Sequence, residues 1–188
     1  MGAGGTPGQR YLGYLDQISG GAQPRIFRVD SLRPDLKGVA AIVYDSAPQP
    51  GWVTAMTYGL SLARHAEWVH FRPELCISVA STDDAWAKAV AEVAERLRGR
   101  SAFLPGETID FGRPISPESA MSSFVVFAPA VIEPDVPIDV GDDLPISITG
   151  IYPIHDEERL FIDEGGLEEF WNEEWDPADV RRPSLVES

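Results

Sequence analysis

The sequence carries TYGLS at residues 57–61, RPEL at 72–75, PGETI at 105–109 with GRPI at 112–115, and YPIHDEE at 152–158. Each string is short, but their fixed order over about 100 residues is difficult to reproduce by chance. None of them is a catalytic signature. The strings therefore indicate a fold and not a reaction.

Residues around these strings have the patterns of β-strands. The apolar run VAAIVY at 39–44 predicts a central strand that ends at Asp45. Residues 52–62 alternate in polarity, and Gly59 suits a bulge or a close backbone approach. Further strands are predicted over residues 75–79, 108–111, 122–128 and 146–152.

Three segments have helical spacing. The clearest helix is predicted over residues 84–98, where one face is apolar and Gly99 provides the exit. The apolar face consists of Trp86, Ala89, Val90, Val93 and Leu97. Shorter helices are predicted over 11–18 and 160–171, the second softly broken by Gly165-Gly166.

The order of these elements predicts one α+β domain. Strands cluster with a few helices and do not alternate regularly with them, which favours a mixed, mainly antiparallel sheet covered by helices. We expect a flexible N-terminus over residues 1–10, the domain over 11–175, and a weakly ordered tail over 176–188, where prolines and polar residues accumulate.

Composition places the chain among globular proteins. Its 188 residues are 44% hydrophobic and 24% charged, which is ordinary for one domain with a core. The single cysteine, Cys76, cannot form an internal disulfide and indicates a reducing compartment. Because the first nine residues lack an apolar signal segment and no apolar run reaches membrane length, we expect a cytoplasmic location.

The net charge of −15 is concentrated near the C-terminus. Residues 1–132 contain 13 acidic and 12 basic residues, whereas residues 133–188 contain 17 acidic residues and three arginines. This excess argues against nucleic-acid binding, since phosphates recruit Lys and Arg. It favours a basic protein partner, although an acidic surface can also serve solubility alone.

No set of residues has the spacing of a catalytic, metal or cofactor site. His65, His70 and His155 show no metal-ligand spacing, and Ser61 lacks the turn and partners of a nucleophile. The Gly-rich residues 1–8 precede no strand-to-helix turn, which phosphate binding requires. We therefore expect no enzymatic activity, no cofactor and no metal.

Two structural hypotheses concern charged and aromatic residues. A salt bridge is expected from Arg72 or Arg113 to Glu157 or Glu158, which we place near the last strand. Trp171 and Trp175 lie four residues apart, so both indoles share one helix face, either packed on the domain or exposed as an anchor for a partner. The second alternative defines a candidate partner-binding set. Its members are Glu164, Glu168, Glu169, Trp171, Glu173, Glu174 and Trp175.

The four strings together resemble the suppressor of fused-like family over about residues 11–171. Gly59-Leu60-Ser61 and RPEL match the family's pattern, whereas Glu107 replaces an Asp and His155 stands where an aromatic or acidic residue is more usual. The resemblance implies an α+β fold and protein binding. It also implies that a chain of this size, without the second domain of the animal members, is bacterial.

The family resemblance sharpens the functional hypothesis without assigning any interface residue. Its animal members are regulators that sequester a transcription factor, and its bacterial members are similar to immunity proteins of polymorphic toxin systems. We therefore expect a non-enzymatic immunity protein that neutralises a basic toxin by stoichiometric binding. The alternatives are a general regulatory or scaffold domain and an enzyme of unknown type.

Overall fold

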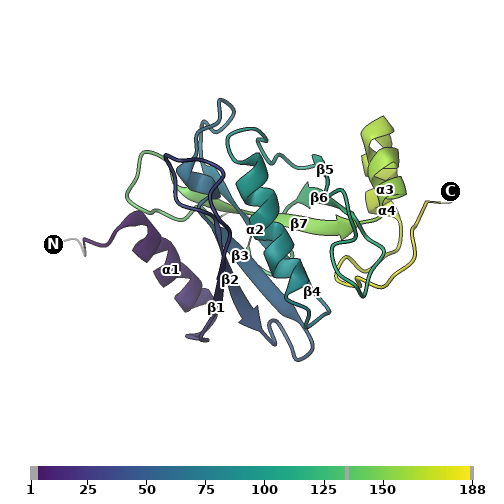
Figure 1. Cartoon of the computed structure of the whole chain (residues 1–188), viewed down its shortest axis with the longest axis horizontal. Helices are drawn as coiled ribbons and strands as arrows, with labels where there is room; N and C mark the ends of the chain where they lie inside the picture. The colour runs from purple at the N-terminus through teal and green to yellow at the C-terminus, as the bar shows by residue number, and fades with distance from the viewer. Residues whose placement is uncertain (1–3, 134–135, 187–188) are drawn as a thin grey trace.

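The computed structural model of the chain describes residues 4–133 and 136–186. Its centre is a seven-stranded sheet in the order β1-β2-β3-β4-β7-β6-β5 (Figure 1). The strands are β1 (Arg25–Arg28), β2 (Ala40–Asp45), β3 (Val53–Tyr58), β4 (Arg72–Val79), β5 (Thr108–Asp110), β6 (Ser123–Phe127) and β7 (Ile146–Ile154).

One pair of neighbouring strands in this sheet is parallel. β4 and β7 run in the same direction with Cys76 opposite Gly150, and the other neighbours are antiparallel. A parallel pair needs a long crossover. Here the crossover contains α2 (Ala85–Leu97), β5 and β6. The predicted α+β class with a mixed, mainly antiparallel sheet is confirmed.

Helix α2 covers one face of the sheet because its apolar stripe is continuous. Figure 1 shows α2 lying across the sheet, and Trp86, Val90 and Val93 are fully or almost fully buried in the core that α2 forms with β2, β3 and β4. The facing strand residues alternate with those that point away, as the two-residue period of a strand requires. The strand residues that join this core include Ala41, Val43, Ala55 and Ile77.

The opposite face of the sheet is covered at its two ends by different helices. Helix α1 (Pro7–Ile18) buries Tyr11 and Leu15 against Ile42 and Met56. At the far end, α3 (Asp156–Phe161), a π-helical turn (Ile162–Gly166) and α4 (Leu167–Asn172) pack on β6 and β7. Figure 1 shows α1 and α3–α4 at opposite ends of the molecule.

The strings TYGLS and RPEL meet at a buried carboxylate. Glu74 accepts hydrogen bonds from the Thr57 hydroxyl (2.6 Å), the Gly59 amide (2.8 Å), and the Ser61 hydroxyl and amide (2.6 and 3.0 Å). Gly59 has a φ of 128°, and a Cβ there would lie 3.1 Å from the Cα of Val39. The predicted close backbone approach at Gly59 is confirmed.

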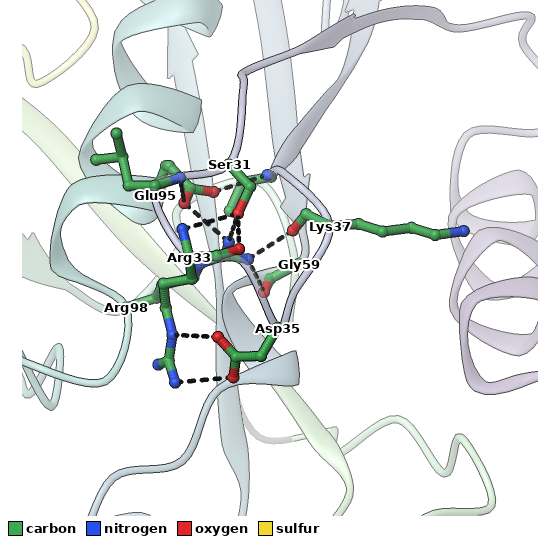
Figure 2. A network of polar contacts seen from close by, with 9 residues as sticks. Ser31, Arg33, Asp35, Lys37, Gly59, Glu95 and Arg98 are labelled. Carbon is green, nitrogen blue, oxygen red and sulfur yellow. Dashed lines mark hydrogen bonds and ion pairs between the residues drawn. The ribbon is translucent and has the colours of Figure 1, made fainter.

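A second buried network joins α2 to the connection between β1 and β2 (Figure 2). Glu95 accepts hydrogen bonds from the amides of Leu32 (2.8 Å) and Val39 (3.0 Å). Arg98 donates to Glu95 (2.8 Å), to the Ser31 hydroxyl and to the carbonyls of Lys37 and Gly59. The side chains of Glu95 and Arg98 are at most 1% exposed, so the connection is held by an ion pair within the interior.

The element boundaries differ from the prediction at several elements, and three of these differences have a clear physical reason. Strand β1 was not predicted, because an edge strand of four residues, RIFR, carries little hydrophobic pattern. Helix α1 begins at Pro7 and not Tyr11, because Thr6 caps it and Pro is favourable in the first turn. The helix expected over 160–171 begins at Asp156, so Glu157 and Glu158 lie in its first turn.

The segment after Asp176 crosses the domain and contacts two of its loops. Ala178, Val180 and Arg182 are buried, and the Ala80 amide donates to the Ala178 carbonyl at 2.9 Å. The Ser119 hydroxyl donates to the Val180 carbonyl. None of the helices in the part of the chain described by the structure is long and apolar enough to cross a membrane.

Candidate protein-interaction surface

The candidate surface lies on the π turn, on α4 and on the residues that follow α4, and a buried ion pair at the start of α3 anchors this region. Glu158 is inaccessible to solvent and binds the Arg182 guanidinium at 2.5 and 2.9 Å. It also accepts the amides of His155 (2.8 Å) and Leu185 (2.9 Å). Burial alone would raise the pKa of Glu158, but Arg182 and the two amides hold it below its ordinary value. Glu158 is therefore an ionised link between α3 and the C-terminal segment.

His155 completes this link. Its amide donates to the Glu158 carboxylate at the start of α3, and its ring Nε2 lies 3.0 Å from the Arg182 carbonyl. Because a carbonyl oxygen can only accept, Nε2–H donates this bond. His155 is thus the N-cap residue of α3, and its Nε2 already has a partner within the protein.

An aromatic cluster holds α4 against the sheet. The Trp171 ring stacks on Phe127 with centroids 4.2 Å apart and meets Tyr152 edge-on at 5.7 Å. Trp175 lies 5.5 Å from Trp171, and the Arg182 guanidinium lies over its ring at 4.6 Å. Both indoles are half-buried. The predicted shared helix face is wrong, because α4 ends at Asn172 and Trp175 follows it in extended backbone, but both rings pack on the domain.

The carboxylates of the candidate set lie outside this cluster, with Glu164 in the π turn, two glutamates on α4 and two just after its end at Asn172. Glu164, Glu168, Glu169, Glu173 and Glu174 are all exposed. None of these five forms a salt bridge with a cation in the described part of the chain. Residues 156–176 contain ten acidic residues and one basic residue, Arg159. The five exposed glutamates form a surface that we call the α4 acidic surface.

The predicted salt bridges from Arg72 or Arg113 to Glu157 or Glu158 are wrong. Arg72 binds Asp142 at 2.9 Å and Asp143, and Arg113 binds Glu92 at 2.8 Å. Glu158 pairs with a different arginine because the C-terminal segment runs back past α3 and places Arg182 next to it. Sequence reasoning missed Arg182 because it assigned residues 176–188 to a tail.

The structure places the remaining sequence candidates apart. His65 and His70 lie in the loop before β4, and His155 caps α3. Across residues 4–133 and 136–186, no group of three or more His, Cys, Asp or Glu side chains is arranged to hold a metal ion. Ser61 is buried and donates its hydroxyl to Glu74. Ser61 and His155 therefore serve the fold.

Comparison with protein families gives a match over most of the chain. The profile of the family described as Suppressor of fused protein (SUFU) matches residues 35–183. The chain belongs to the suppressor of fused family. No curated protein sequence shows significant similarity to it. The matched range contains all four strings and continues beyond Asp176 to the segment that carries Arg182.

Solved structures of suppressor of fused proteins share the fold. A protein described as a SUFU homologue from Neisseria gonorrhoeae superimposes with a TM-score of 0.71 at 18% identity, covering 96% of this chain and 97% of that chain. A chain from the Sufu–Fu complex gives 0.65 at 14% identity, with coverages of 94% and 91%. The Drosophila Suppressor of Fused gives 0.69 at 13% identity; the match covers 95% of the present chain and 51% of the Drosophila chain.

Three suppressor of fused strings contribute glutamates that bind backbone amides. Glu74 of RPEL accepts two amides of the TYGLS turn, and Glu107 of PGETI accepts the Leu104 amide at 3.0 Å. Glu158 of YPIHDEE accepts one amide at the start of α3 and one in the C-terminal segment. Each carboxylate thus fixes a loop that has little regular backbone pairing.

Proposed function

We propose that the chain is a protein-binding domain that acts by stoichiometric binding, and that the α4 acidic surface contacts a basic partner. The observation that carries the proposal is the group of five exposed glutamates without cationic partners in the described structure, beside a helix that the aromatic cluster holds in place. Exposed carboxylates accelerate association with a basic surface and select against acidic partners. The Sufu–Fu complex supports the protein-binding role, since it is a complex formed by a family member.

The partner that we propose is a basic protein toxin, which makes this chain an immunity protein. This partner is supported by the family resemblance, by the C-terminal concentration of negative charge and by the exposed carboxylates on and next to α4. Blocking a toxin requires a complementary surface and no reaction. A regulatory or scaffold domain with an endogenous partner is the second candidate, and the Sufu–Fu complex favours it.

Affinity capture from the native cell lysate at low salt, followed by a salt gradient and mass spectrometry, tests the acidic surface. We expect a basic protein that elutes as the salt concentration rises, because screening weakens exposed charge pairs. With the captured partner purified, Glu168→Gln, Glu169→Gln, Glu173→Gln and Glu174→Gln together should reduce its low-salt affinity about tenfold, chiefly through the association rate.

A charge-matched control separates this surface from net charge. The double variant Glu173→Gln with Glu174→Gln is compared with Asp30→Asn with Glu67→Gln, which removes two exposed carboxylates away from α4. Equal loss of affinity in the two doubles, or none in either, would contradict the α4 acidic surface. Growth arrest by the partner alone and rescue by co-expression of this chain would support an immunity role; a partner that is harmless when expressed alone would favour the regulatory alternative.

A further inference from the structure

The sheet face opposite α2 has an apolar groove at its centre. Helix α1 covers one end of this face and α4 covers the other, while β3 and β4 cross the region between them. Alternate residues of the strands point to this face and line the region, among them Thr54, Met56 and Ser78. The residues that follow β6, Pro129 to Val131, border the same space.

Two adjoining cavities form the groove. The first, of about 410 Å³, lies between α1 and strands β2 and β3 and is lined by Tyr14, Ile18, Tyr44 and Met56 among others. The second, of about 240 Å³, lies over β4 and β7 and is lined by Trp52, Cys76, Tyr152 and Ala178 among others. Both cavities are lined by Pro48 and Val131, so they lie side by side. We call the pair the α1 groove.

Exposed apolar side chains lie at the mouth of the α1 groove. Ile18 at the end of α1 is 43% exposed and Val136 is 50% exposed. Burial of such side chains by a partner is favourable by roughly 25 cal/mol for each Å² removed from water. Because the cavities are of the size that takes one or two large side chains, the groove suits a segment of chain better than a flat protein surface.

The charges of the groove have one sign. Glu133 lines the first cavity and Asp176 lines the second, and no described Lys or Arg lines either. Glu133 lies near the Tyr14 hydroxyl: burial, and then the Glu133 carboxylate, raise the pKa of Tyr14 above its ordinary value. Asp16 adds a further carboxylate near Tyr44 at the α1 side. An occupant would therefore present apolar groups to the walls and positive charge to the rim.

We propose that the α1 groove is a docking site for a short extended segment of a protein partner, in which one or two large apolar side chains are flanked by Lys or Arg. The apolar side chains enter the two cavities, and the flanking cations face Glu133 and Asp176. The site uses different residues from the five glutamates of the α4 acidic surface. Either site can therefore be present without the other.

A pair of fluorescein-labelled peptide libraries tests the proposal. Both consist of nonapeptides with Leu, Met or Phe at the three central positions and serine elsewhere, and they carry either Lys or Glu at the second and eighth positions. We expect the lysine library to raise fluorescence anisotropy with the full chain, and the glutamate library to bind at least tenfold more weakly. Backbone amide shifts in nuclear magnetic resonance spectra should then concentrate at Tyr44, Met56, Val131 and Tyr152.

Variants of exposed residues provide the matched control. Ile18→Lys and Glu133→Lys should each weaken binding of the lysine library at least tenfold, whereas Leu12→Lys should leave it unchanged. Leu12 lies on the same helix, is 41% exposed and lines neither cavity. Absence of binding, equal binding of the two libraries, or shifts confined to α4 would overturn the groove proposal; the last result would still agree with the α4 acidic surface.

Discussion

Two buried glutamates, Glu74 and Glu158, show how surroundings decide the behaviour of the same side chain. Glu74 accepts four hydrogen bonds and forms no ion pair in the described structure, and burial raises its pKa above the ordinary value. Glu158 has Arg182, and its pKa is lowered. We expect the two carboxyls to make opposite contributions to the pH dependence of stability.

Replacement of Glu158 by Gln should destabilise the domain by about 3–5 kcal/mol, because it leaves the buried Arg182 guanidinium without a counter-charge. Thermal unfolding followed by circular dichroism measures the effect. Glu157→Gln is the control, since Glu157 occupies the same turn without an ion-pair partner in the described structure. Equal melting temperatures for wild type and Glu158→Gln would show that the pair does not stabilise the fold.

The pH dependence of the same variant has a definite sign. Because the folded pKa of Glu158 is lower than the unfolded value of about 4.3, ionised Glu158 contributes its full stability above that pH and loses it as the pH falls through the folded pKa. The difference in unfolding free energy between wild type and Glu158→Gln should be constant from about pH 6 to 8 and should narrow below about pH 4. Urea unfolding across this range measures it, and a gap that widens in acid would contradict the assignment.

Glu74 should tolerate Gln better than Leu. Gln keeps an acceptor for the Gly59 and Ser61 amides, and its amino group can donate to the Thr57 hydroxyl, so we expect a loss of about 1 kcal/mol. Leu would leave buried donors without acceptors, at a cost of about 3 kcal/mol or more. Urea unfolding at pH 7 compares the two variants; a Leu variant as stable as the Gln variant would argue that these hydrogen bonds contribute nothing.

At the scale of elements, charged side chains fix the conformation of loops that are not stabilised by strand pairing. Residues 29–39 have little regular pairing between β1 and β2, and the Glu95–Arg98 pair at the end of α2 supplies several of their hydrogen bonds (Figure 2). Hydrophobic periodicity predicts α2 well, but this pattern says nothing about the two charged residues that point from the helix into the interior. Their role follows from the loop that crosses the end of the helix.

Hydrogen exchange should report the loosening of this loop. Glu95→Gln replaces one acceptor oxygen by a donor, so the Leu32 or Val39 amide loses its partner. We expect exchange at one or both amides to accelerate roughly 10- to 100-fold, the equivalent of about 1–3 kcal/mol. Glu92→Gln is the control, because Glu92 lies one turn earlier on α2 and its ion pairs are with exposed arginines. Unchanged protection of both amides in Glu95→Gln would contradict the role of this network.

Across the whole molecule, the C-terminal segment joins distant parts of the fold. Val180 belongs to the α2 core, Arg182 binds Glu158, and the Ala178 carbonyl binds the loop after β4. We therefore propose that the folded domain continues beyond residue 175. The family match extends through residue 183, which agrees with a domain that continues beyond residue 175.

Truncation tests where the domain ends. A chain that ends at Trp175 should lose more than about 5 kcal/mol of stability, or fail to unfold cooperatively, because it lacks Val180 and leaves Glu158 buried without Arg182. A chain that ends at Val186 retains these contacts and serves as the control. Calorimetry compares the two, and similar melting temperatures would show that the segment is dispensable, as expected of a weakly ordered tail.

Local patterns in the chain were sufficient to predict the class of the fold, the family, helix α2 and six of the seven strands. These features depend on hydrophobic periodicity, on the positions of glycine and proline, and on short strings. Each of these patterns can be recognised from residues that are close together in the sequence. The acidic region was also predictable, since charge can be counted along a chain. The short edge strand β1 and the start of α3 were not predicted, because they depend on pairing and capping partners more than on pattern.

Only the tertiary structure shows which charged residues form ion pairs and where cavities lie on the surface. Glu158 and Arg182 are 24 residues apart, and only the path of the C-terminal segment brings Arg182 to α3. The α1 groove likewise combines side chains from α1, from several strands and from the residues after β6. Ion pairs and cavities arise where distant segments pack against one another. Periodicity reports only which face of an element is buried, so it could not identify the partner that covers that face.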